Sequence, residues 1–166
     1  MELDGLSPEE AAAVEWVRSM VRDSGGKKLS LLAEVSNHTT WEYEKTVDAP
    51  QVFCLWRMSK EKRMLLWKEL QPQLQLCELA LGGEWIGFKC PVDDEELAIL
   101  CPKGSSLHAL QQLVLYAADR VTDSGLQTLA SAGCGAQLTN LTLDWLEEGV
   151  TDSGLQTLAS AGCGAQ

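Results

Sequence analysis

The sequence has few basic residues for its length. Its 166 residues include 13 Lys and Arg against 24 Asp and Glu, which gives a formal net charge of −11. Residues 1–70 hold 10 basic and 12 acidic residues, whereas residues 71–166 hold 3 and 12, a net charge of −9. Phosphate groups need a positive surface. The charge therefore argues against binding to nucleic acid or to an anionic membrane.

Long apolar runs are also missing. No stretch approaches the roughly 20 apolar residues of a membrane-spanning helix, and the first ten residues lack the basic start and apolar centre of a signal peptide. Apolar residues still make up 45% of the chain, enough for a buried core. We therefore expect a cytoplasmic or nuclear protein with no membrane partner.

The residues that usually carry catalysis or bind metal are scarce. The two histidines, His38 and His108, stand far apart, and none of the six cysteines forms a Cys-x-x-Cys pair. The acidic run 93–96 lacks the glycine and the spacing of a calcium-binding loop, so we interpret it as the solvated first turn of a helix. The sequence predicts no metal, no cofactor and no enzymatic activity.

The chain contains an internal repeat. Residues 121–137 and 150–166 share the same seventeen letters, VTDSGLQTLASAGCGAQ, at an offset of 29 residues. Each copy follows a segment of the form L-x-x-L-x-L, and a third such segment lies upstream, before a diverged helical unit at residues 92–100. The three segments are Leu76-Cys-Glu-Leu79-Ala-Leu81, Leu110-Gln-Gln-Leu113-Val-Leu115 and Leu138-Thr-Asn-Leu141-Thr-Leu143.

Residues 71–166 resemble leucine-rich repeats. The Val-Thr-Asp-Ser-Gly-Leu start and the Ala-Gly-Cys end are similar to the cysteine-containing and ribonuclease-inhibitor-like subtypes. The resemblance implies an α/β fold, a solenoid of about three repeats with parallel strands and helices. One departure is that the usual ladder Asn or Cys is replaced by Glu84, Ala118 and Leu146. We therefore expect irregular turns after the strands.

Each unit fits this architecture physically. Leu113 and Leu115 alternate along a strand, so both should point inward. Thr122 or Asp123 is placed to cap the following helix, and Gly133 to end it in a left-handed conformation. Each unit leaves an apolar side open until a neighbour stacks on it. Because the sequence stops after a helical unit, we expect a frayed last repeat, the end of a longer array, or self-association through that repeat.

Residues 1–70 are predicted to form a mainly helical cap region. Ser7-Pro-Glu-Glu10 is a capping box that should start a helix running to about Arg22. Residues 51–70 are predicted to be helical in two pieces that break near Ser59, and residues 29–35 form a short apolar segment of unassigned type. Trp56 and Trp67 are expected to cover the open side of the first repeat.

A second interpretation of this region stays open. The stretches Val52-Phe-Cys54-Leu-Trp56 and Leu66-Trp67-Lys-Glu-Leu70 resemble the tail of an F-box, although the usual Leu-Pro opening is missing. That resemblance implies a substrate-recognition adaptor of a ubiquitin ligase, in which the helices dock a scaffold and the repeats hold the substrate.

The candidate site is the strand surface of the repeats. In leucine-rich repeats the residues between and after the strand leucines face solvent in columns along the concave side. Tyr and Trp are common interface anchors, and the charge of −9 favours a basic partner. We therefore expect a non-enzymatic protein–protein interaction module. The residues assigned to partner binding are Glu78, Gln112, Val114, Tyr116, Asn140, Thr142, Asp144 and Trp145.

Overall fold

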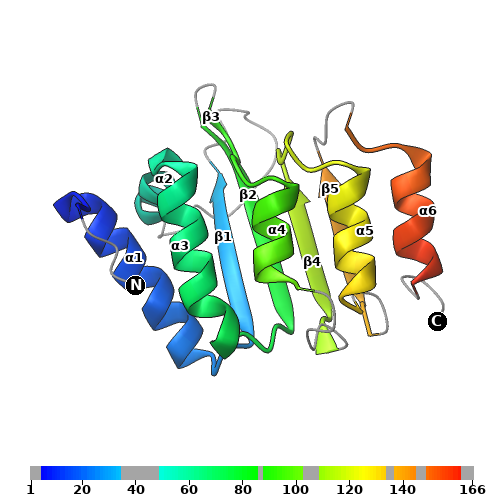
Figure 1. The fold of residues 1–166 in the computed structure, drawn as a ribbon, viewed down its shortest axis with the longest axis horizontal. Coiled ribbons are helices and arrows are strands. Elements are labelled where there is room, and N and C mark those ends of the chain that lie inside the picture. Colours follow the sequence, from blue (N-terminus) through cyan, green and yellow to red (C-terminus); the bar gives the residue numbers. More distant parts are fainter. Residues whose placement is uncertain are drawn as a thin grey trace.

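The computed structural model describes residues 5–34, 49–85, 88–102, 109–133, 137–144 and 149–161. It has an α/β fold in which strands and helices alternate (Figure 1). In chain order the elements are α1 (Pro8–Asp23), β1 (Lys28–Glu34), α2 (Ala49–Arg57), α3 (Lys60–Leu70), the 3-10 helix η1 (Gln71–Gln73), β2 (Glu78–Trp85), β3 (Phe88–Lys89), α4 (Asp94–Leu100), β4 (Gln112–Tyr116), α5 (Asp123–Ser131), β5 (Asn140–Asp144) and α6 (Asp152–Ser160).

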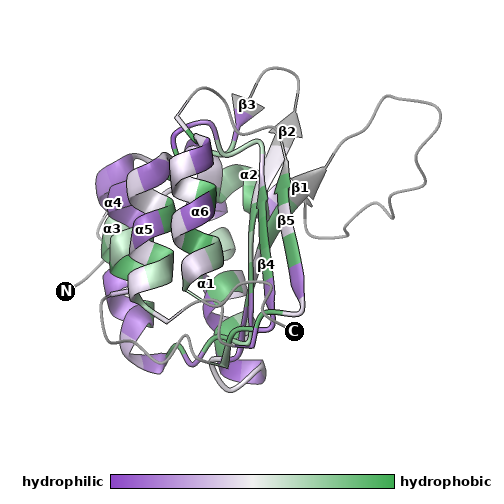
Figure 2. Ribbon diagram, turned by 90° about the vertical axis from the view of Figure 1, so that its right-hand side faces the viewer, coloured by the Kyte–Doolittle hydropathy of each residue, from purple (hydrophilic) through white to green (hydrophobic). Residues whose placement is uncertain are grey.

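The sheet is parallel along its main path. Its strand order is β1-β2-β4-β5, and the short β3 pairs antiparallel with β2. Figure 2 shows the helices on one side of the sheet, whereas its other face carries no helix in the described part of the chain. The helices therefore cover the core on one side, and we call the other side, which carries no described helix, the open face.

The strand leucines lie in register across the sheet. One column joins Leu29, Leu79, Leu113 and Leu141, and the next joins Leu31, Leu81, Leu115 and Leu143. The leucines of β1, β2 and β4 in these columns are fully buried, as the alternation predicts. In β5, by contrast, the side chain of Leu141 is 42% exposed. The inward leucines are therefore fully covered from β1 to β4, whereas Leu141 of β5 is covered only in part.

The segment of unassigned type at residues 29–35 provides strand β1. It pairs with β2 from Lys28–Glu78 to Glu34–Glu84, and α3 lies between the two strands in the chain. The sheet thus has one more parallel strand than the three L-x-x-L-x-L segments predict.

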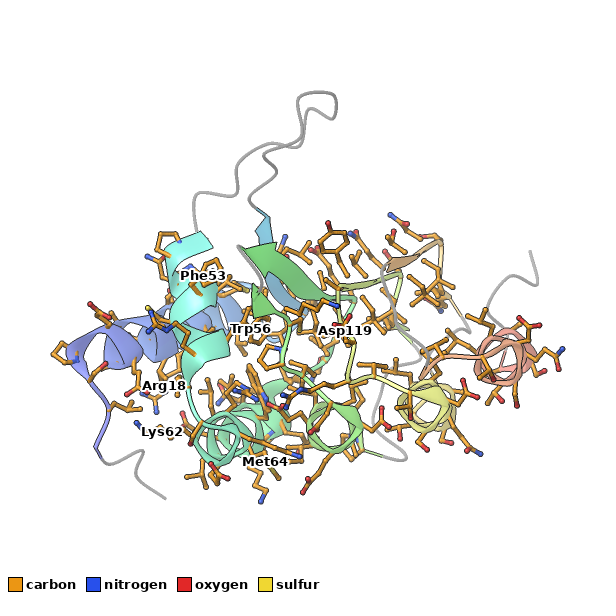
Figure 3. The ribbon with its side chains drawn as sticks, turned by 90° about the horizontal axis from the view of Figure 1, so that it is seen from above. Arg18, Phe53, Trp56, Lys62, Met64 and Asp119 are labelled. Carbon is orange, nitrogen blue, oxygen red and sulfur yellow. The ribbon has the colours of Figure 1, made fainter. Side chains whose placement is uncertain are left out.

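The helices of the N-terminal region begin where the sequence places them. Ser7 and Glu10 form the capping box of α1, with Ser7 Oγ accepting from the Glu10 amide at 3.2 Å and Glu10 Oε2 accepting from the Ser7 amide at 2.8 Å. Ser59 caps α3 and separates it from α2, so the predicted break is confirmed. Seen from above, α2 with Phe53 and Trp56 lies at the β1 end of the sheet (Figure 3).

Trp56 and Trp67, which were expected to cover the first repeat, are both buried against the sheet and its helices. Trp67 is fully buried, and Trp56 Nε1 donates to the carbonyl of Gly82 in β2 at 3.3 Å. One cluster of buried residues runs from α1 through the sheet to α6. The N-terminal region and the strands of the repeats therefore share one core.

The turn that follows β4 is irregular, as the missing ladder residue predicts. Ala117 has φ of +50°, in the left-handed region that side chains other than glycine rarely adopt. Its carbonyl accepts from the Cys90 amide at 3.2 Å, which ties the turn to the segment after β3.

Within the described ranges, none of the helices has both the length and the apolar character that crossing a bilayer requires.

Candidate functional site

The open face of the sheet brings the predicted site residues together. Strand register places Glu78, Gln112 and Asn140 side by side in one row. The same register forms a second row from Ala80, Val114 and Thr142, and a third from Gly82, Tyr116 and Asp144. These rows are the columns of residues that the repeat alignment predicts, and strand register reproduces them.

Exposure across this face rises toward β5. Ala80 is buried, Gln112 and Val114 are half-buried, and Asn140 and Thr142 are exposed. Trp145 lies outside the described residues, and of Asp144 only the backbone belongs to them. A partner would thus find the most accessible side chains on β4 and β5.

Strand β2 contributes two small residues, Ala80 and Gly82, to the second and third rows, and both are buried. A Cβ atom built at Gly82 would overlap the backbone and the Cβ of Tyr116, so no larger residue fits there without moving β4. The half-buried Val114 and Tyr116 of β4 lie next to these small residues in the second and third rows.

Few of the side chains that the structure describes on this face are acidic. Glu78 is its one described acidic side chain on β2, β4 and β5, and its Oε1 lies 3.0 Å from Lys28 Nζ on β1. The other described acidic groups of this half gather elsewhere, chiefly at the first turns of α4, α5 and α6. Most of the acidic side chains that the structure describes in residues 71–166 therefore lie on the helix side of the sheet.

The acidic first turns form a ladder between neighbouring helices. Asp94 of α4 accepts from the Thr122 amide at 2.9 Å and from its hydroxyl at 2.6 Å. Asp123 of α5 accepts from the Thr151 amide at 2.8 Å and from its hydroxyl at 2.6 Å. Thr122 and Thr151 are themselves the N-caps of α5 and α6. Each carboxylate therefore holds the cap of the next helix, and we call this arrangement the Asp–Thr ladder.

Each aspartate of the ladder lies against a glycine in the first turn of the next helix. A Cβ atom at Gly125 would overlap Asp94 Oδ1, and a Cβ atom at Gly154 would overlap Asp123 Oδ1. Hydrogen bonds from the hydroxyl and amide of Thr151, with a contribution from the Gly154 amide, lower the pKa of Asp123 below its usual 3.8. Glycine in the third helical position thus makes room for the carboxylate of the preceding unit.

The interface between α3 and α4 uses different chemistry. Glu96 is fully buried and accepts two hydrogen bonds from Arg63, from Nε at 2.9 Å and from Nη2 at 3.1 Å. Trp67 Nε1 donates to the same carboxylate at 2.9 Å, and Arg63 Nη1 donates to the Met58 carbonyl at 2.6 Å. This corrects the interpretation of residues 93–96 as a solvated turn, because Glu96 points into the core.

The other residues of that acidic run have structural roles as well. Asp93 caps α4 by accepting from the amides of Glu95 and Glu96, both at 3.1 Å, and also binds Lys60 Nζ at 2.6 Å. Among the described residues no group of three or more His, Cys, Asp or Glu side chains is arranged to hold a metal ion. The run joins α3 to α4 by ion pairs.

The cysteines whose pKa is perturbed are not activated. Burial raises the pKa of the Cys90 thiol to about 12, and burial followed by the charge of Glu9 raises that of Cys54. Both groups stay protonated near neutral pH, so neither is suited to act as a nucleophile.

No protein-family model, curated protein or solved structure matches the chain.

Proposed function

We propose that the protein is a non-enzymatic protein–protein interaction module, and that its strand–helix units form a short leucine-rich-repeat solenoid. The observation that carries the proposal is the face of the sheet without described helices (Figure 2), on which strand register sets the residues of β2, β4 and β5 in rows. Hydrogen-bonded parallel strands offer a rigid surface. Because that surface is already ordered, less conformational entropy is lost when a partner binds.

The solenoid part of the proposal has its own support. Leucine columns run across the strands, and two identical rungs of the Asp–Thr ladder join α4 to α5 and α5 to α6. In each rung the two residues are 28 positions apart in the chain. Counting β1 with α3, four strand–helix units would line the sheet.

The expected basic partner still rests on the charge of −9 of residues 71–166. Among the described side chains of the open face Glu78 is the acidic one, and it is paired with Lys28. We therefore propose a partner segment that combines polar and apolar side chains, because the rows combine Gln112, Val114 and Asn140 with Tyr116.

The alternative role as a ubiquitin-ligase adaptor receives no support from the N-terminal helices. An adaptor of that kind needs an exposed apolar helical face to dock its scaffold. Most large apolar residues of the F-box-like stretches are instead buried in the common core, and Phe53 is half-buried against it. The buried ones are Val52, Leu55, Trp56, Leu66, Trp67 and Leu70.

Site-specific photo-crosslinking tests the proposed surface. A photoreactive amino acid placed at Gln112 or Thr142 should yield discrete protein adducts in a cell extract, whereas the same group at Gln127 or Gln156, exposed on α5 and α6, should not. Adducts that form equally well from the helix positions, or from none of the four, would contradict the proposal.

A further inference from the structure

The β5–α6 end of the molecule has the same kind of surface with which α4 contacts α5 and α5 contacts α6. Asp94 binds the N-cap of α5, and Asp123 binds the N-cap of α6 with nearly the same distances. Asp152 holds the equivalent first position of α6, 29 residues after Asp123. Its side chain is exposed.

The apolar side chains of this end show the same difference. Leu126 of α5 is fully buried beside α6, whereas its equivalent Leu155 is 41% exposed. Leu113 of β4 is fully buried beside β5, whereas Leu141 is 42% exposed. These two leucines are the exposed large hydrophobic residues of the described chain. The exposure is therefore confined to the positions that a following unit would cover.

We propose that the β5–α6 end is a stacking surface that accepts a further strand–helix unit, whose N-cap hydroxyl and amide bind Asp152 and whose apolar side covers Leu141 and Leu155. The proposal rests on the solenoid described above. Its basis is continuity, because the same interface joins α4 to α5 and α5 to α6.

The chemistry of the occupant follows from the ladder. It must present a Ser or Thr at its helix N-cap and a glycine at the third helical position, because any Cβ there overlaps the preceding carboxylate. A second copy of this chain does not offer such a cap. Thr122 and Thr151 are already bound, and the N-cap of α4 is Asp93, which is held by Lys60. The serine N-caps Ser7 and Ser59 are followed at the third helical position by Glu10 and Lys62 rather than by glycine.

The test compares the full chain with a version that carries one additional copy of residues 138–166 at its C-terminus. Stacking should raise the Tm by at least about 2–4 °C and increase the denaturant m-value, since more surface is buried on folding. Asp152→Ala should lower the Tm of the extended chain clearly and that of the original chain little. An unchanged Tm on extension, or an equal effect of Asp152→Ala in both chains, would overturn the proposal.

Two controls keep these results interpretable. Gln127 on α5 stays exposed although α6 stacks beside it, so its equivalent Gln156 should stay exposed in the extended chain. Gln156→Ala should therefore leave the Tm of both chains unchanged.

Sedimentation velocity on the original chain tests whether a second copy of the chain occupies the surface. Concentration-dependent dimers that Leu155→Ser abolishes would assign the surface to a second copy and overturn the proposal, whereas a monomer at all concentrations supports it.

Discussion

At the residue scale, small changes in side chain decide how neighbouring units join. The third helical position is Gly125 in α5 and Gly154 in α6, and the preceding aspartate lies over each glycine. In α4 the same position is Glu96, which reaches back to Arg63 instead. A glycine at this position leaves space for the carboxylate of the previous helix. A glutamate at this position instead places its own carboxylate at the joint, where Arg63 of the previous helix binds it.

Gly125→Ala should destabilise the protein, although the same change in most helices stabilises by about 0.5–1 kcal/mol. The new Cβ displaces Asp94, whose two hydrogen bonds to Thr122 contribute roughly 1–3 kcal/mol together. We expect a net loss of about 1 kcal/mol in urea unfolding. Ser124→Ala, at an exposed neighbouring site, is the control. A stabilised Gly125→Ala variant would show that the ladder contributes nothing.

Glu96→Ala should lower the free energy of unfolding by about 3–5 kcal/mol, because it leaves the guanidinium of Arg63 buried without its charge partner. Replacing both partners, as in Arg63→Met with Glu96→Leu, should recover part of that loss. Two apolar side chains leave no unpaired charge, but the buried Trp67 Nε1–H loses its acceptor. Urea denaturation of the three proteins checks this. A double variant as unstable as Glu96→Ala would mean that packing, rather than the charge, dominates.

Acid should weaken the ladder in a direction that the pKa of Asp123 sets. A folded-state pKa below the unfolded value of 3.8 means that the carboxylate stabilises the fold above that pH, and that this contribution is lost as pH falls through the lower folded value. The urea concentration at the midpoint of unfolding should therefore decrease when the pH is lowered below about 4. This decrease should be smaller in Asp123→Asn. Parallel curves for the two proteins below pH 4 would exclude a role for this carboxylate.

At the scale of elements, local signals predicted what local chemistry determines. The capping box at Ser7 and the cap at Ser59 set helix starts that the structure confirms. The L-x-x-L-x-L segments likewise marked β2, β4 and β5. Strand β1 could not be assigned, because it has only Leu29 and Leu31 in alternation, and two helices separate it from its partner β2.

The candidate surface was largely predictable and the joints between units were not. Once the repeats are aligned, the columns on the open face follow from residue spacing alone. The burial of Glu96 had no local signal, because it sits in an acidic run and its partner Arg63 is 33 residues away. The Asp–Thr ladder was similarly hidden, since Asp123 was a candidate cap for its own helix and instead holds the cap of the next.

Stability should fall along the array toward its last unit. In a stacked array each unit depends on its neighbours, and β5 and α6 have a described neighbour on one side only, with Leu141 and Leu155 exposed. Native-state hydrogen exchange should therefore be faster in β5 and α6 than in β2 and β4. Uniform protection across the four strands would show that the core is equally cooperative throughout.

At the scale of the whole molecule, the two sides of the sheet differ in purpose. The helix side holds the core, the buried ion pair and the ladder, together with most of the described acidic groups of residues 71–166. The β1 end is covered by α1 and α2 (Figure 1), while β5 and α6 carry the exposed Leu141 and Leu155. The open face is the side that these structural tasks leave available for recognition.

The affinity of the crosslinked partner for variants of the open face tests this account most directly. Gln112→Arg combined with Thr142→Arg introduces bulk and charge on β4 and β5, and Gln127→Arg combined with Gln156→Arg makes the matched change on α5 and α6. With Tm unchanged in both, we expect the first pair to raise Kd at least about tenfold, equal to roughly 1.4 kcal/mol, and the second pair to leave it unchanged. A Kd that rises only with the helix-side pair would contradict the assignment of the open sheet face as the binding surface.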